Sequence, residues 1–184
     1  MRTILMVLSI GAAVGLGHSA FGADIASTFT GTMTQTEGSN STTMPDQLVL
    51  TTHTDANGNY LPQMETEETY NGHVINTEFR NPVALPDGSG YLFEMFGKAD
   101  GGDFEDLGQF TATGMPGAFT SVTFDHTHLI GDSTLFQTGT GTTTNEKDGS
   151  VVLTRNEQIV DVNNVVQFTV TSTVTHMPVS IKVH

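Results

Sequence analysis

The chain has 184 residues, and its 20 Asp and Glu residues outnumber its 6 Lys and Arg residues, which gives a formal net charge of −14 at neutral pH. This excess of negative charge repels nucleic acid backbones and anionic lipid surfaces, so we expect no nucleic acid partner. The sequence contains no cysteine. A disulfide framework is therefore excluded, and the fold must rely on its hydrophobic core.

Residues 1–22 have the pattern of a secretory signal peptide. A short basic start is followed by an apolar run from Ile4 to Leu16, and the small residues Ala20 and Gly22 suit the positions before a cleavage site. The apolar run is shorter than the ~20 residues that a membrane-spanning helix needs. The sequence therefore predicts cleavage after Gly22, with Ala23 as the near alternative, a secreted or periplasmic protein, and no membrane span.

Residues 23–184 have the length of one domain, for which we expect a monomer. In the segments 27–35 (STFTGTMTQ) and 166–176 (VQFTVTSTVTH), threonine alternates with apolar or small residues. Alternation with a period of two is typical of a half-buried strand that turns its threonine face toward water. We find no convincing helical periodicity after residue 22, so the sequence predicts an all-β domain.

Turn motifs divide the rest of the chain into short segments. Asn57-Gly58 and Asn71-Gly72 are examples, and such pairs supply the positive φ angles that tight hairpins need. The predicted strands lie near 26–36, 46–55, 59–70, 73–80, 90–97, 106–113, 118–130, 133–143, 150–161 and 164–176, with a short tail at 179–183. Short connections favour an antiparallel meander closed into a barrel of about 8 to 10 strands. A two-sheet β-sandwich or jelly roll is the alternative.

The segment VTFDHTHLIGD, residues 122–132, is the candidate metal site. In a strand, His126 and His128 share a face with Phe124, while Asp125 lies on the opposite face. Neighbouring positions on one face are ~6–7 Å apart, which lets two imidazoles reach one divalent metal ion. His126 and His128 are therefore predicted metal ligands. The acidic loop at 98–108 is a second candidate, for calcium.

His126, His128, Asp132 and Gly139 have a spacing that partly resembles the cupin metal motif. The family has Glu where Asp132 stands, and no second motif with a third histidine follows. The resemblance implies a metal-dependent enzyme that uses the two histidines.

Aromatic and histidine side chains are predicted to line the interior of the barrel. Glu94 lies among apolar neighbours in GYLFEMFG, where a buried carboxyl group would have a raised pKa and could act as an acid or a base. The candidate ligand-binding residues are Phe93, Glu94, Phe124, His126, His128, Phe168 and His176.

Three functions are compatible with the sequence. The first, which we favour, is an exported β-barrel that binds a small apolar or amphipathic ligand. The second is the cupin-like enzyme, and the third is a surface structural or interaction protein without a pocket. Because the sequence lacks the common hydrolase, nucleotide-binding and metalloprotease motifs, the prediction leans away from an enzyme.

Overall fold

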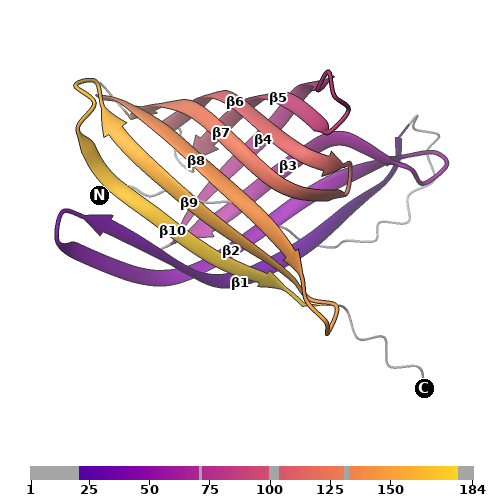
Figure 1. Cartoon of the computed structure of the whole chain (residues 1–184), viewed down its shortest axis with the longest axis horizontal. Coiled ribbons are helices and arrows are strands. Elements are labelled where there is room, and N and C mark those ends of the chain that lie inside the picture. The colour runs from indigo at the N-terminus through magenta and orange to yellow at the C-terminus, as the bar shows by residue number, and fades with distance from the viewer. Residues whose placement is uncertain (1–20, 71, 100–103, 131–132, 178–184) are drawn as a thin grey trace.

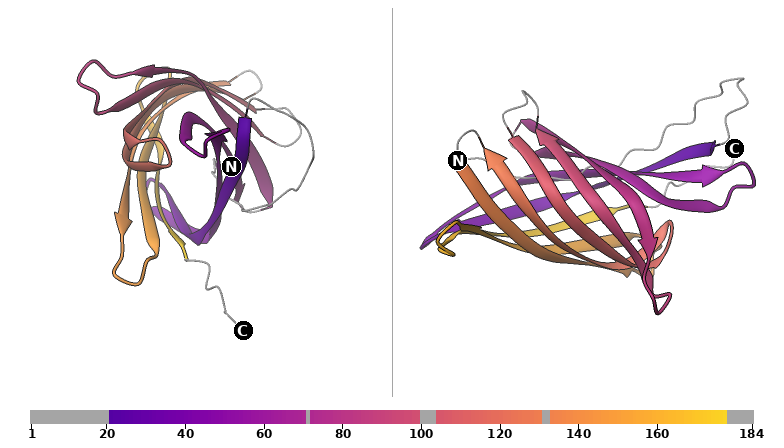
Figure 2. Two further views of the ribbon diagram at one scale, coloured as in Figure 1. Left: turned by 90° about the vertical axis from the view of Figure 1, so that its right-hand side faces the viewer. Right: turned by 90° about the horizontal axis from the view of Figure 1, so that it is seen from above.

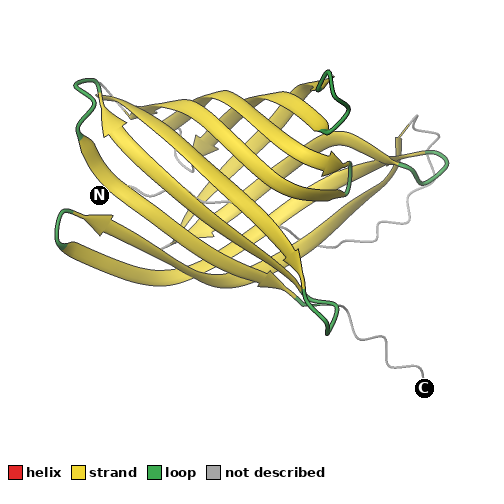
Figure 3. Ribbon diagram, viewed as in Figure 1, coloured by secondary structure: helices red, strands yellow, loops and turns green. Residues whose placement is uncertain are grey.

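The computed structural model describes residues 21–70, 72–99, 104–130 and 133–177, and these residues form ten strands (Figures 1 and 3). The strands are β1 (Phe21–Glu37), β2 (Asn40–Asp55), β3 (Tyr60–Tyr70), β4 (His73–Ala84), β5 (Gly90–Ala99), β6 (Phe104–Met115), β7 (Ala118–Ile130), β8 (Ser133–Asn145), β9 (Val151–Asp161) and β10 (Val166–His176). No helix long and apolar enough to span a membrane occurs in these residues.

Each strand pairs antiparallel with the next strand in the chain, and β1 also pairs with β10, so the sheet closes into a barrel (Figure 2). The closing register sets Gly31 opposite Val174. Closure leaves no strand with an unpaired edge, which removes the usual site of edge-to-edge aggregation. The predicted ten-strand meander and its barrel closure are confirmed, and the sandwich alternative is wrong. The predicted signal peptide lies mostly outside the described residues, and the predicted tail at 179–183 lies wholly outside them.

The alternation of threonine with apolar residues corresponds to the two faces of the barrel wall. On β1, Met33 is completely buried whereas Thr30 and Thr32 are exposed. On β10, Val174 is completely buried between outward-facing threonines. Packing of the inward side chains therefore holds the barrel together, and hydroxyl groups cover much of its surface.

Aspartate side chains organise four of the hairpin turns. In the turn between β2 and β3, Oδ1 of Asp55 accepts hydrogen bonds from the backbone amides of Asn57 (2.8 Å) and Asn59 (2.9 Å). Gly58 has a φ of 83° there, as the Asn-Gly pair predicts. The same type of contact recurs at Asp87, Asp148 and Asp161. Hydrogen bonds lower the pKa of each of the four carboxyl groups: those from a side chain in the same turn contribute most at Asp55, Asp87 and Asp148, and that from a backbone amide contributes most at Asp161.

The interior consists of apolar residues at both ends with a polar layer between them. One apolar cluster contains Met33, Ile75, Ile159 and Val170, and we call its side of the barrel the packed end. Two further clusters, centred on Phe93 and on Leu48, fill the other side. We call that side the loop end, because the turns that follow β2, β4, β6 and β8 lie there. Successive inward positions on β10 show the order: Val170 belongs to the packed end, Ser172 to the polar layer and Val174 to the loop end.

At Gly31 the wall leaves no room for a side chain. A Cβ atom added there would lie 2.0 Å from the backbone oxygen of Thr173 on β10. Because this obstacle is backbone rather than a movable side chain, any larger residue must displace one of the two strands that close the barrel.

Gly31→Ala is expected to lower the free energy of unfolding by about 1–3 kcal/mol, since it overpacks the contact between β1 and β10. Thr32→Ser, at the exposed neighbouring position, should change the free energy of unfolding by less than about 0.5 kcal/mol. Urea denaturation of both variants measures the difference. Equal stability of the two variants would contradict the close approach of β1 to Thr173.

Candidate functional site

A buried ion cluster crosses the barrel between its two ends. The guanidinium group of Arg155, on β9, donates to both carboxylate oxygens of Glu68 on β3, at 3.1 and 2.6 Å. It also donates to Oδ2 of Asp46 on β2, at 3.3 Å. The three side chains are at most 4% exposed. One cation therefore ties together three strands that are far apart in the sequence.

Further polar side chains complete the polar layer. Glu157 lies two residues after Arg155 on the same face of β9, and its Oε1 is 3.7 Å from Nη1 of Arg155. Nε2 of Gln137 donates to the other oxygen of Glu157 at 2.6 Å. The hydroxyl of Ser172 donates to Oδ2 of Asp46 in a short hydrogen bond. The layer thus connects strands β2, β3, β8, β9 and β10 through their inward side chains.

Three carboxyl groups share one guanidinium group in this layer, so negative charge is in excess. Burial raises the pKa of Glu68 well above its usual range, and the attraction of Arg155 opposes that rise only in part. Burial also disfavours the charged form of Arg155, but the attraction of Glu68 and Glu157 outweighs it and raises the pKa of the guanidinium group. The raised pKa of Glu68 favours its neutral form, which reduces the excess charge, while the raised pKa of Arg155 keeps the guanidinium group ionised.

A cavity of about 280 Å³ lies between this layer and the turns of the loop end. Its lining is largely apolar and comes from Ile25, Phe29, Leu48, Leu50, Met64, Phe79, Phe110, Ala118, Phe119, Val122, Val151 and Leu153. Arg155 also lines the cavity, so the ion cluster lies at its inner end. The volume is near the lower limit of the ~300–1,000 Å³ typical of small-molecule sites.

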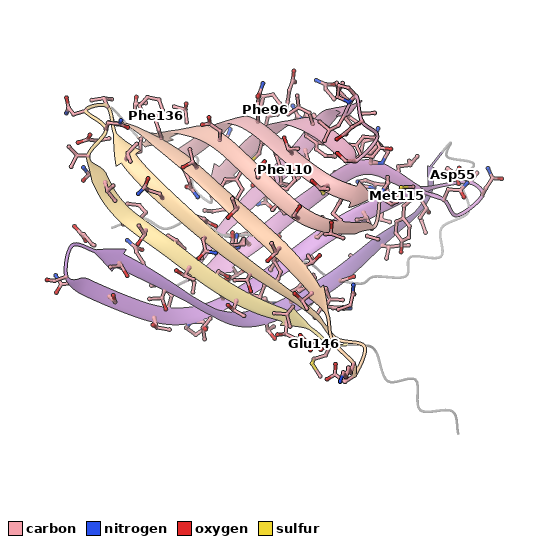
Figure 4. The ribbon with its side chains drawn as sticks, in the orientation of Figure 1. Asp55, Phe96, Phe110, Met115, Phe136 and Glu146 are labelled. Atoms are coloured by element: carbon pink, nitrogen blue, oxygen red, sulfur yellow. The ribbon has the colours of Figure 1, made fainter. Side chains whose placement is uncertain are left out.

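Tyr60 and Gly117 lie at the outer end of the cavity. A Cβ atom at Gly117 would come within 2.5 Å of the Tyr60 ring, and Gly117 has a φ of 75°. A larger residue there would push the ring aside. Tyr60 is 43% exposed, so the ring lies between the cavity and solvent. Figure 4 labels Asp55, Met115 and Glu146, which lie at or beside the turns of this end.

His176 is the only one of the predicted ligand-binding residues with a described side chain that lines the cavity. Its ring packs against Phe29, with ring centroids 5.3 Å apart. Phe93 and Phe124 are buried in the apolar cluster behind the cavity wall, where they contact the lining residues. Phe168 packs at the opposite, packed end of the barrel.

Glu94 lies on the outer face of the barrel. Its neighbours Phe93 and Met95 take the inward positions on β5, so strand alternation turns Glu94 outward. The side chain is exposed and accepts a hydrogen bond from Nδ2 of Asn81 at 2.7 Å. It therefore does not occupy the buried environment that its apolar neighbours in the sequence suggest, and it does not line the cavity.

The predicted metal site involves residues whose side chains lie outside the description. His126 and His128 belong to β7, where their backbones pair with Gly108 and Asp106 of β6. Among the described residues, no group of three or more His, Asp or Glu side chains is arranged to hold a metal ion. The acidic loop at 98–108 also falls largely outside the described side chains. A divalent metal at His126 and His128 stays a prediction.

Comparisons with protein-family models, with curated proteins and with solved structures found no match to this chain. Its function must therefore be inferred from its own residues. What the fold and the site define is a closed ten-strand β-barrel with an apolar cavity at one end and a buried ion cluster beneath it.

The ion cluster is the feature that sequence reasoning missed. Arg155 and Glu157 occupy the same face of β9 as Leu153 and Ile159, so strand alternation already turns two charged residues into the interior. Buried charges are rare unless they are paired, and this pattern was the available signal. The partners Asp46 and Glu68 share an inward strand face with Leu48 and Met64 in the same way, but nothing in the sequence shows that they meet Arg155.

Arg155→Met is expected to lower the free energy of unfolding by about 3–5 kcal/mol, because it leaves the buried carboxyl groups without their cation. The matched control is Arg80→Met. Arg80 pairs with Glu78 on the surface, where both side chains are about half exposed, and the expected loss is only about 0–1 kcal/mol. Urea denaturation measures both effects. Comparable losses in the two variants would show that the Arg155 cluster does not hold the barrel together.

The contribution of Glu68 to stability is expected to fall as the pH rises above the ordinary glutamate value of 4.5, because the pKa of Glu68 is higher in the folded protein than in the unfolded chain. The turn aspartates act in the opposite sense, but only below their ordinary value of 3.8. Glu68→Gln should flatten the decline between pH 4.5 and 7.5, and the exposed neighbour variant Glu67→Gln should not. Urea midpoints across this pH range provide the measurement, and parallel curves for the two variants would exclude Glu68 as the cause.

Proposed function

We propose that this protein is an exported binding protein that holds a small, mostly apolar molecule in the cavity at the loop end. The observation that carries the proposal is the cavity itself, with a volume of about 280 Å³ and apolar walls. Protein interiors are normally close-packed, and few voids exceed the size of a water molecule. The cavity is several times larger than the ~30 Å³ that one water molecule occupies in the liquid. A ligand site therefore explains it better than a packing defect does.

The walls of the cavity support binding of a rigid, flat apolar body. Phe79 and Phe110 lie with their ring centroids 4.4 Å apart. Phe119 makes an edge contact with Phe93, with centroids 6.3 Å apart. These rings belong to hydrogen-bonded strands of a closed sheet, so the pocket is formed before the ligand enters and binding orders few side chains. Apolar contact with such walls supplies most of the expected affinity.

Export of the protein from the cytoplasm is also part of the proposal. The predicted signal peptide at residues 1–22 supports export, and the absence of cysteine makes the fold insensitive to the redox state of its surroundings. An exported barrel with an apolar cavity would meet small hydrophobic molecules outside the cytoplasm.

The experiment uses N-phenyl-1-naphthylamine, an uncharged dye whose fluorescence rises in apolar surroundings. The protein should bind the dye with saturation, and Ser27→Phe should weaken binding at least ~10-fold, because Ser27 lines the cavity and a phenyl ring there occupies the space of the ligand. Ser41→Phe is the matched control, since Ser41 is exposed near the other end of the barrel. Circular dichroism checks that both variants keep the fold.

Two results would contradict the proposal. One is the absence of saturable dye binding to the unmodified protein. The other is equal binding by the Ser27 and Ser41 variants, which would place the dye on the surface rather than in the cavity.

A further inference from the structure

The hydroxyl groups of the threonines that line the cavity donate hydrogen bonds to backbone carbonyl groups. Thr52 donates to the oxygen of Ile25 at 3.1 Å, and Thr143 donates to the oxygen of Phe119 at 2.7 Å. Thr66 and Thr120 make the same type of contact with carbonyl oxygens, at 3.4 and 3.3 Å. A hydroxyl group has one hydrogen to donate and two lone pairs. These four side chains therefore offer a ligand only acceptors.

His176 also offers a ligand only a hydrogen-bond acceptor, because of its tautomer. Nδ1 lies 2.9 Å from the backbone oxygen of Thr28. A carbonyl oxygen can only accept, so Nδ1 carries the hydrogen, and in the neutral imidazole Nε2 is then a lone-pair acceptor. Since His176 lines the cavity beside Phe29, its ring adds a strong acceptor to an otherwise apolar wall.

The remaining donors of the lining are poorly placed to serve a bound molecule. The terminal nitrogens of Arg155 already donate to Glu68 and Asp46, and its Nε, which has no hydrogen-bond partner, is buried. Tyr60 and Asn145 lie at the exposed mouth. Ser27 has a hydroxyl that can rotate to donate or to accept. The inner part of the cavity thus presents acceptors in excess.

The charges around the cavity also disfavour an anionic ligand. The ion cluster at the inner end contains three carboxyl groups for one guanidinium group, and the whole chain has a formal net charge of −14. Only Arg155 of this cluster lines the cavity, and the three carboxyl groups behind it outnumber its single charge. An anionic ligand would therefore meet a net negative field and few free donors to replace its hydration. Carboxylates, which many hydrophobic ligands carry, are therefore disfavoured.

From this geometry we infer that the cavity selects uncharged apolar molecules whose polar group donates a hydrogen bond, of which a hydroxyl group on an aromatic body is the best match, and that Nε2 of His176 accepts that bond. The inference rests on the proposed function and adds the chemical class of the ligand. The aromatic walls at Phe29, Phe79 and Phe110 favour the flat body, and His176 supplies the preference for its hydroxyl group.

A matched series of naphthalenes tests this preference at neutral pH. 2-Naphthol donates a hydrogen bond, 2-methoxynaphthalene has the same ring and oxygen but only accepts, and 2-naphthoate is an anion. The protein should bind 2-naphthol roughly threefold to tenfold more tightly than 2-methoxynaphthalene, the range expected for one neutral hydrogen bond. 2-Naphthoate should bind most weakly of the three. Displacement of N-phenyl-1-naphthylamine gives the three affinities.

His176→Phe should reduce the ratio of the affinities for 2-naphthol and 2-methoxynaphthalene to about one, because an aromatic ring remains against Phe29 and only the acceptor is lost. His53→Phe is the control. His53 pairs with Asp24 at 2.8 Å and does not line the cavity, so its replacement should leave the preference unchanged. The ratio of the two affinities reports the acceptor even if both variants lose some stability.

The outcomes separate this inference from the proposed function. Equal binding of 2-naphthol and 2-methoxynaphthalene, or tightest binding of 2-naphthoate, would overturn the preference for a donor while the cavity remains a binding site. A preference for 2-naphthol that survives in His176→Phe would overturn the role of His176. If neither the naphthalenes nor the dye bind, the proposed function itself fails.

Discussion

The structure depends on the burial of one guanidinium group. Arg155 cannot reach water, so the barrel must bring acceptors to it, and the two that it contacts most directly lie 87 and 109 residues earlier in the chain. A one-residue slip in the register of β2, β3 or β9 would turn one of these side chains to the outer face and leave the others unpaired. The ion cluster therefore ties the closure of the sheet to a single register. Its hydrophobic neighbours contribute more of the stability, but they tolerate exchange more easily than a buried ion pair does.

The same cluster divides the interior into two regions with different packing. On one side, methionine, isoleucine and valine side chains fill the packed end around Met33 and Ile159. On the other side, aromatic rings surround a cavity that reaches the turns of the loop end. An unfilled cavity forgoes the contacts that close packing would supply, and proteins commonly sacrifice stability in this way at sites of function. Arg155 gives the cavity a floor whose hydrogen bonds to Glu68 and Asp46 are fixed. The inner end of the cavity is thus set by the position of Arg155 along β9.

The functional argument rests on the site alone. Barrels serve many unrelated functions, so the fold by itself would not distinguish a binding protein from a structural one. The distinction comes from chemistry inside the barrel. The lining combines aromatic surface with hydroxyl groups whose hydrogens are already used by backbone carbonyl groups. A structural barrel would have no need of such an interior space.

The local pattern of the sequence determined the strands, because period-two alternation and turn residues act over only a few positions. It predicted ten strands, the hairpins at Gly58 and Gly72, and the inward face that carries His176. The prediction of inward and outward side chains failed where alternation was weak. Glu94 has apolar neighbours on both sides, and only the burial of Phe93 and Met95 shows that it points outward. Alternation likewise turns Arg155, Asp46 and Glu68 inward, but it cannot say that they meet. The closure of the barrel decided that these three side chains meet, because contacts between strands distant in the chain depend on the register of the whole sheet.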